Sequence, residues 1–273
     1  MDRSSASRQL PVLAEPRRAR ILEIVNERGS VRVSELAELI GVAQPTVRKD
    51  VADLDRHRLL RRTHGGALAL PAAYEPPIAD RAERNVEAKE AIAQACVAEI
   101  GDGDAIYLDS GTTAQAIARA MGAPMHDVAG PRRPRNVNVL TNAIGVAEIL
   151  SNCPEIRTTV LGGHFRVAGG CFVGPLALAA IGQFTVNIAF IAVSGLFEES
   201  LSVADVAEAQ LKRAVMDRAR RVAVPMDATK IGTVDFVQLC GLERIDLLVT
   251  DAVDAGLATQ CRRAGVDRIV AAI

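Results

Sequence analysis

The fold class of most of this chain can be read from residues 105–113, Ala-Ile-Tyr-Leu-Asp-Ser-Gly-Thr-Thr. The first four residues predict a buried strand at 105–108, because they form a short apolar run between polar residues. The Asp-Ser-Gly triplet is typical of a turn, and a helical pattern then runs over 112–121. A buried strand that leads directly into a helix is the repeating unit of an α/β sheet.

The same alternation of strand and helix fills the rest of the C-terminal part. We expect a helix at 88–100 before the first strand and a long helix at 204–220. Further apolar strands are predicted at 137–140, 158–161, 188–193, 221–224, 247–249 and 268–271. This order predicts an α/β fold, a doubly wound and mostly parallel sheet with helices on both faces. Residues 122–135, rich in Pro, Gly and Arg, are interpreted as an irregular insertion.

The N-terminal part has the pattern of a small helical module. Apolar residues at helical spacing predict helices at 17–28, at 35–40 and at about 44–58. Gly29 ends the first helix, Ser34 is expected to cap the second, and Gly41 turns the chain toward the third. Two short helices joined by a glycine turn have helix-turn-helix geometry. Residues 59–67 then predict a strand, a turn and a second strand, which would form a small wing.

A chain of 273 residues has the length of about two domains. The boundaries follow from the change of pattern and from the prolines that separate the two parts. We expect a flexible N-terminal extension at 1–16, a winged helix-turn-helix domain at 17–70, a linker at 71–83 and an α/β domain at 84–273.

Charge and composition limit the function further. Residues 17–64 carry eleven Lys or Arg against seven Asp or Glu, a net charge of +4, whereas the whole chain has a net charge of −1. A basic module on a mildly acidic body is typical of a nucleic-acid-binding protein. Aromatic residues are only 3% and Trp is absent, which argues against stacking on single strands and favours a duplex.

Other classes of protein are excluded by what the sequence lacks. No apolar run approaches the roughly 18 residues of a membrane span, so we expect no membrane contact and a cytoplasmic protein. The five cysteines never have Cys-x-x-Cys spacing, which argues against a disulfide framework and a structural zinc site. We therefore expect neither a metal nor another cofactor.

The third helix of the small module is the candidate for reading DNA bases. Small polar and basic residues lie in its first turns, where base edges in the major groove are reached. The wing supplies basic residues suited to backbone phosphates. The candidate DNA-binding residues are Ser34, Gln44, Pro45, Thr46, Arg48, Lys49, Arg61, Arg62 and His64. The alternative at this point is a docking module whose charges form only a solvated face.

Several predicted strands of the large domain end in small, polar or glycine residues. Ligands of parallel sheets bind at the carboxyl ends of the strands. At 110–113, backbone N–H groups, hydroxyls and the start of a helix together suit a phosphate. Thr141-Asn142 and Gly162-Gly163 follow the next two strands, and Lys230 follows a later one, well placed for an anion. Helix caps, tight turns and a surface charge are the alternative interpretations of these residues.

Two sets of motifs resemble one known family. Thr-Val-Arg-Lys-Asp at 46–50 and Arg-Thr-His-Gly-Gly-Ala at 62–67, within the run 33–67, resemble the DNA-binding domain of the DeoR family of bacterial transcriptional regulators. Leu-Asp-Ser-Gly-Thr-Thr at 108–113 and Asp-Ala-Thr-Lys at 227–230 resemble the sensor domain of that family. The family's sensor is similar in fold to ribose-5-phosphate isomerase and binds phosphorylated sugars or related phosphorylated metabolites.

The resemblance implies roles for individual residues. Ser110, Gly111, Thr112 and Thr113 would hold a phosphate. The rest of the pocket would be shaped by Asp109, Thr141, Asn142, Gly162, Gly163, Glu208, Asp227 and Lys230. The isomerases carry Asp-Gly-Ala-Asp-Glu after the strand that matches 188–193, whereas this chain has Ala-Val-Ser-Gly-Leu at 192–196. We therefore expect no catalytic residues.

The favoured hypothesis is a regulator, most often a repressor in this family, that binds double-stranded operator DNA under the control of a phosphorylated sugar. One alternative is a sugar-phosphate isomerase-like enzyme with an appended docking domain, and another is a metabolite-binding scaffold that no longer binds DNA. One short recognition helix reads few base pairs, so we expect a homodimer or a homotetramer.

Overall fold

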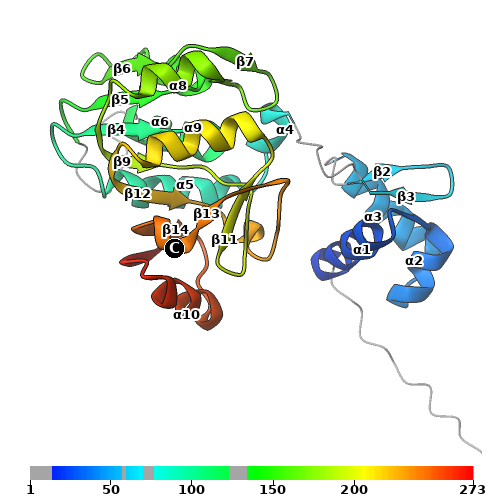
Figure 1. Ribbon diagram of the computed structural model, residues 1–273. Coiled ribbons are helices and arrows are strands. Elements are labelled where there is room, and N and C mark those ends of the chain that lie inside the picture. Colours follow the sequence, from blue (N-terminus) through cyan, green and yellow to red (C-terminus); the bar gives the residue numbers. More distant parts are fainter. Residues whose placement is uncertain (1–13, 57–59, 70–76, 123–133, 273) are drawn as a thin grey trace, which may run out of the picture. The chain divides into compact units, whose positions relative to one another are not determined.

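The computed structural model describes residues 14–56, 60–69, 77–122 and 134–272. Most of the predicted extension at 1–16, part of the predicted linker at 71–83 and most of the insertion at 122–135 lie outside the described residues. The chain divides into two compact units, Met1–Tyr74 and Glu75–Ile273. Each unit is described by itself (Figure 1).

The N-terminal unit is a winged helix-turn-helix. Its elements in chain order are α1 (Ala14–Arg28), β1 (Ser30–Arg32), α2 (Val33–Ile40), α3 (Gln44–Arg56), β2 (Arg61–Arg62) and β3 (Gly66–Leu68). The three strands form an antiparallel sheet in the order β1-β3-β2. Gly29 and Gly41 adopt positive φ angles of 72° and 74°, as the ends of α1 and α2 require. The core beneath the helices includes Ile21, Leu36 and Val47.

The start of α2 corrects one prediction. The helix begins at Val33 rather than at 35, and Ser34 is its second residue and caps nothing. The cap position is Arg32, which makes no side-chain cap hydrogen bond. The amide of Val33 instead donates to the Gly65 carbonyl at 2.9 Å. Because β1 pairs with β3, the wing backbone takes over the role that a capping hydroxyl would have had.

The C-terminal unit is built on a seven-stranded parallel sheet in the order β15-β14-β12-β9-β4-β5-β6. Every strand predicted from the sequence is present, shifted by at most a few residues. The strands are β4 (Ala105–Leu108), β5 (Asn138–Thr141), β6 (Arg157–Val160), β9 (Val186–Phe190), β12 (Ala219–Pro225), β14 (Leu247–Thr250) and β15 (Arg268–Ala271). The doubly wound α/β fold is therefore confirmed.

Helices cover both faces of this sheet, and each face has its own apolar core. One core joins the sheet to α5 (Val86–Val97), α6 (Thr112–Gly122) and α7 (Ile144–Leu150). The other joins it to α8 (Pro175–Ile181), α9 (Val206–Met216) and α10 (Ala255–Ala264). In Figure 1, α8 and α9 lie in front of the sheet and α5 and α6 behind it.

Several short elements were not predicted. A three-stranded antiparallel sheet consists of β10 (Gly195–Phe197), β11 (Ser200–Val203) and β13 (Val237–Gly241), and a separate hairpin consists of β7 (His164–Arg166) and β8 (Cys171–Val173). The unit also contains α4 (Ile78–Ala82) and two 3-10 turns, η1 (Ala228–Lys230) and η2 (Leu242–Arg244). These elements are too short to have a recognisable period. None of the helices in the described ranges has the length and apolar character to cross a bilayer.

Candidate functional site

The first turns of α3 present the predicted base-reading side chains to solvent. Gln44, Pro45, Arg48 and Lys49 are exposed and Thr46 is half-buried, while the apolar residues of α3 pack into the core. These five side chains therefore lie together at the N-terminal end of the second helix of the helix-turn-helix. That end is the part of a recognition helix that meets base edges.

The opposite face of α3 is tied to α1 by buried charge pairs. The Asp50 carboxylate, 1% exposed, accepts from Arg17 Nε at 2.5 Å and from Arg18 Nε at 3.2 Å. Arg18 also pairs with Asp53. Burial opposes the charge of Asp50, but the hydrogen bonds from the two arginines outweigh it and lower its pKa below the usual value. These pairs fix the orientation of the recognition helix relative to α1.

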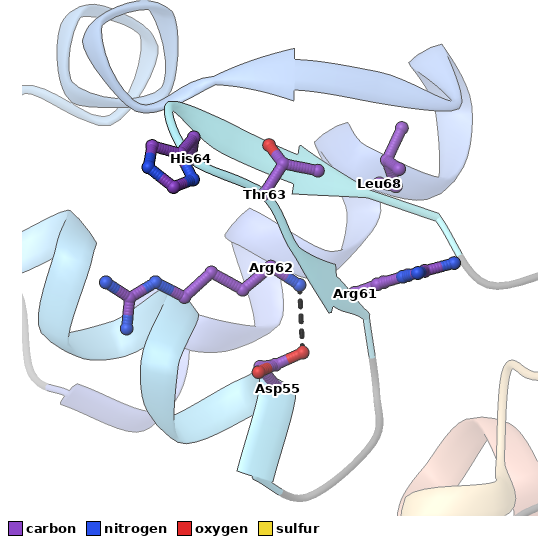
Figure 2. A pocket seen from close by; sticks show the side chains of 6 residues that line it. All are labelled: Asp55, Arg61, Arg62, Thr63, His64 and Leu68. Atoms are coloured by element: carbon purple, nitrogen blue, oxygen red, sulfur yellow. Dashed lines mark hydrogen bonds between the residues drawn. The ribbon is translucent and has the colours of Figure 1, made fainter.

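The wing borders a hollow that contains most of the predicted phosphate-contacting residues (Figure 2). The hollow is lined by Asp55, Arg61, Arg62, Thr63, His64 and Leu68. Asp55 Oδ1 accepts from the Arg62 amide at 2.8 Å and so joins the end of α3 to β2. Figure 2 shows Arg62 and His64 extending to one side of the strand and Arg61 to the other, as alternation along a strand requires. Ser34 is exposed on α2 and does not line this hollow.

In the C-terminal unit, the predicted residues gather where the parallel strands end. We call this edge, formed by the residues after β4, β5, β9 and β12, the carboxyl-edge site. At its centre the Asp109 carboxylate, 1% exposed, pairs with Lys212 Nζ of α9. The same carboxylate accepts from the amides of Ser110 at 2.8 Å and Ala192 at 2.9 Å. Asp109 thus fastens together the ends of β4 and β9 and the buried side of α9.

Ala192 also explains why β9 is shorter than predicted. The apolar run extends to Val193, but β9 ends at Phe190. Beyond Phe190 the backbone turns to meet Asp109, and the carbonyl of Val193 accepts from Lys230 Nζ at 2.8 Å. Apolar character alone could not indicate this departure from the sheet.

The turn after β4 contains the residues for which the sequence predicts an anion site. Gly111 has a backbone φ of 105°, a conformation that residues other than glycine rarely adopt. This turn leads into α6, whose first residues are Thr112 and Thr113. The Ser110, Thr112 and Thr113 side chains are buried at the edge of the sheet. The first amides of a helix have no acceptor within the helix, so this turn can bind an anion.

A second charge pair lies beside the first. Glu208 Oε1 accepts from Arg166 of the β7–β8 hairpin at 2.8 Å, and Glu208 Oε2 lies 4.0 Å from Lys212 Nζ. Burial opposes the charge of Lys212, but the carboxylates of Asp109 and Glu208 outweigh it and raise the pKa of Lys212 above its usual value. The lysine is therefore held as a cation.

The residues after β5 and β6 support the hairpin. The Asn142 side chain accepts from the Tyr107 hydroxyl and donates to the Phe172 carbonyl, each at 2.9 Å. Thr141 Oγ1 accepts from the Ala143 amide at 3.1 Å. Gly162 and Gly163 lead into β7, and a Cβ on Gly163 would lie 2.6 Å from the Val173 carbonyl. These four predicted residues lie at the edge, and the contacts of Asn142 hold β8.

A set of lysines flanks the residues after β12. Asp227 is buried, and its negative charge favours the charged forms of both Lys89 and Lys230. Burial lowers the pKa of Lys89 to about 8; Asp227 opposes this, while Lys230 adds to it. Burial also lowers the pKa of Lys230. A site with an excess of cations favours a bound anion.

Four residues at the carboxyl edge were absent from the predicted set: Lys89, Arg166 and Lys212, which carry charge, and Asn85. Lys212 lies four residues after Glu208 on one helix face, so helical spacing could have indicated it. Arg166 reaches the edge from the hairpin, and Asn85 and Lys89 reach it from the start of the unit. No local pattern places those three beside the strand ends.

Comparison with known protein families matches both units. Residues 17–71 match the DeoR-like helix-turn-helix domain, and residues 84–252 match the DeoR C-terminal sensor domain. The chain belongs to the DeoR family. It is therefore a DNA-binding transcriptional regulator, and its α/β unit is the DeoR sensor domain.

Two relatives, both repressors by name, agree with this family. The glycerol-3-phosphate regulon repressor of Escherichia coli K12 is 30% identical over 85% of this chain and 88% of its own length. A putative aga operon transcriptional repressor of Escherichia coli O157:H7 is 30% identical over 93% of each chain. The structure of ribose 5-phosphate isomerase A from Methanocaldococcus jannaschii matches 54% of this chain and 55% of its own, at 19% identity and a TM-score of 0.38.

Proposed function

We propose that this DeoR-family protein is a repressor that binds operator DNA and releases it when a phosphorylated sugar, or a related phosphorylated metabolite, binds the carboxyl-edge site. The observation that carries the proposal is the turn at 110–113, which combines a positive-φ glycine, buried hydroxyls and a helix start at the same edge of the sheet as Lys230. The relatives support repression, since one of them is named as the repressor of the glycerol-3-phosphate regulon. We also infer that two copies bind together, because one recognition helix reads few base pairs.

The charges at the site favour a phosphorylated ligand over a neutral sugar. Asp109 is balanced by Lys212, and Glu208 is balanced by Arg166. Lys230 adds a further cation, and burial of its side chain makes the charged form energetically costly. A dianionic phosphate at the start of α6 would lower that cost, and the helix dipole would add to the attraction.

The enzyme alternative lacks its acids. The segment from Ala192 to Leu196 contains no carboxylate. Two of the acids at the site are held in ion pairs, Asp109 with Lys212 and Glu208 with Arg166. We therefore propose a site that binds without catalysis. Incubation with ribose 5-phosphate is expected to give no isomerised product, and measurable turnover would restore the alternative.

The roles proposed for the recognition helix and the wing can be separated on a library of randomised duplexes. Arg48→Ala is expected to cost about 1–3 kcal/mol of operator affinity and to relax the choice of base at one position. Arg62→Ala is expected to weaken binding to all sequences alike and to reduce the salt dependence by about one counterion. Arg244→Ala, an exposed arginine of the sensor domain, is the control. Equal loss of selectivity in the Arg48 and Arg62 variants would contradict this assignment.

The ligand class can be tested by thermal shift against phosphorylated sugars and their unphosphorylated counterparts. A ligand at 100 times its dissociation constant adds about 2.7 kcal/mol to the free energy of unfolding. We expect the shift to require the phosphate and to fall in Thr112→Val, which keeps the shape and removes a hydroxyl. Thr259→Val, at an exposed threonine of α10, is the matched control. An equal shift with unphosphorylated sugars would rule out the phosphate site.

A further inference from the structure

The first helix of the sensor domain is held in place from several sides. α4 has only five residues, Ile78–Ala82, and a helix of this length is not stable on its own. The chain then turns at Asn85, which has a positive φ of 49°, and enters α5. Lys89 Nζ of α5 donates to the carbonyls of Arg81, at 2.6 Å, and of Arg84. The lysine thereby satisfies carbonyls at the C-terminal end of α4 and joins that end to α5.

α4 also contacts the β7–β8 hairpin. Arg81 donates to the carbonyl of Ala168 at 2.9 Å, and a Cβ on Gly170 would lie 3.3 Å from Ile78 Cδ1. The hairpin is in turn fastened to the carboxyl-edge site through Arg166 and Glu208. A change at Glu208 can therefore reach α4 through two contacts, the ion pair with Arg166 and the hydrogen bond from Arg81 to the Ala168 carbonyl.

The turn after α4 reaches the other side of the same site. Asn85 Nδ2 donates to Asp227 Oδ1 at 3.0 Å and to Thr229 Oγ1 at 3.2 Å. Asp227 precedes η1, which carries Lys230. α4 and its turn thus bridge the hairpin on one side of the site and η1 on the other.

We propose that residues 78–85 form a clasp that tightens over the carboxyl-edge site when a phosphorylated ligand binds. The inference rests on the proposed function and adds the route by which binding is passed on. α4 is the first described element after β3 of the DNA-binding unit, so along the chain it lies between that unit and the carboxyl-edge site. A ligand that binds better to the tightened state would shift the equilibrium between the two states.

Electrostatics explains why an anion would tighten the clasp. The positive charges of Lys230, Arg81 and Arg84 oppose the charge of Lys89, whereas the buried carboxylate of Asp227 favours it. The mutual repulsion of these cations works against closure. A bound phosphate would compensate these charges, so the contacts of α4 would strengthen only when the site is occupied.

Hydrogen exchange on the full-length protein, with and without inorganic phosphate as the probe, tests this clasp. We expect phosphate to slow amide exchange about tenfold over both 110–115 and 78–89. In Asn85→Gly the slowing over 78–89 is expected to be lost and that over 110–115 to remain, since glycine keeps the positive φ and removes only the side chain. Asn136→Gly, at an exposed asparagine with φ of 57°, is the matched control and should behave like the unmodified protein.

The possible failures are distinct. Slowing over 110–115 with unchanged exchange over 78–89 would overturn the clasp and leave the proposed ligand site standing. An Asn85→Gly variant that keeps the slowing over 78–89 would overturn the role of Asn85 in closure. Unchanged exchange over both segments would overturn the phosphate site and the clasp together.

Discussion

Replacing Lys212 by alanine is expected to destabilise the sensor domain by about 3–5 kcal/mol, because it leaves the buried Asp109 carboxylate without its cation. The side chains of this pair are 4% and 1% exposed, so water cannot replace the lost ammonium. Asp109 also joins two strand ends through the amides of Ser110 and Ala192, and its displacement would disturb both. Urea unfolding of the full-length protein, followed by circular dichroism, measures the change.

Two further variants test whether the loss of stability comes from the unpaired buried charge. Arg244→Ala breaks an ion pair with Asp217 in which the side chains are 48% and 64% exposed, and it should cost no more than about 1 kcal/mol. The double variant Asp109→Asn with Lys212→Met removes both charges and should recover part of the stability lost in the single variant. If Lys212→Ala costs no more than Arg244→Ala, the pair does not stabilise the fold.

Replacing Asp50 by asparagine is expected to reduce the selectivity of DNA binding as well as stability. The change removes the charge that holds Arg17 and Arg18 against the recognition helix. We expect a loss of about 2–3 kcal/mol in stability, less than for a fully buried pair because Arg18 is 32% exposed. Arginines released toward phosphates would raise affinity for random duplexes and steepen the salt dependence. Fluorescence anisotropy on operator and random duplexes over a salt series measures both effects.

Glu23→Gln is the control for this variant, because Glu23 pairs with Arg20 on the exposed side of α1, the helix that carries Arg17 and Arg18, and both side chains are 59% exposed. It should leave the ratio of operator to random affinity unchanged. A purely structural role for Asp50 would lower stability while the ratio and the salt dependence stayed the same. Since the pKa of Asp50 is lowered in the folded state, its contribution is present above the unfolded pKa of about 4 and is lost as pH falls through the folded value.

Local patterns in the sequence were enough for the main architecture. The apolar runs at 105–108 and 247–249 fall in β4 and β14, because buried parallel strands are continuous apolar segments. The glycine turns at Gly29 and Gly41 were equally readable, since only a few residues adopt positive φ. The start of α2 was not, because the partner of the Val33 amide is Gly65, in the turn of the wing just before β3.

The candidate site likewise has a part that local sequence predicts and a part that only the folded structure brings together. The turn at 110–113 could be found from its residues alone, since a strand, a glycine turn and a helix start are consecutive in the chain. The pairing of Asp109 with Lys212 spans 103 positions, and that of Arg166 with Glu208 spans 42. Such pairs depend on which strand ends and helices the sheet brings side by side. Sequence periodicity describes the neighbours of a residue along one element, whereas burial of a charge beside its partner is a property of the folded core.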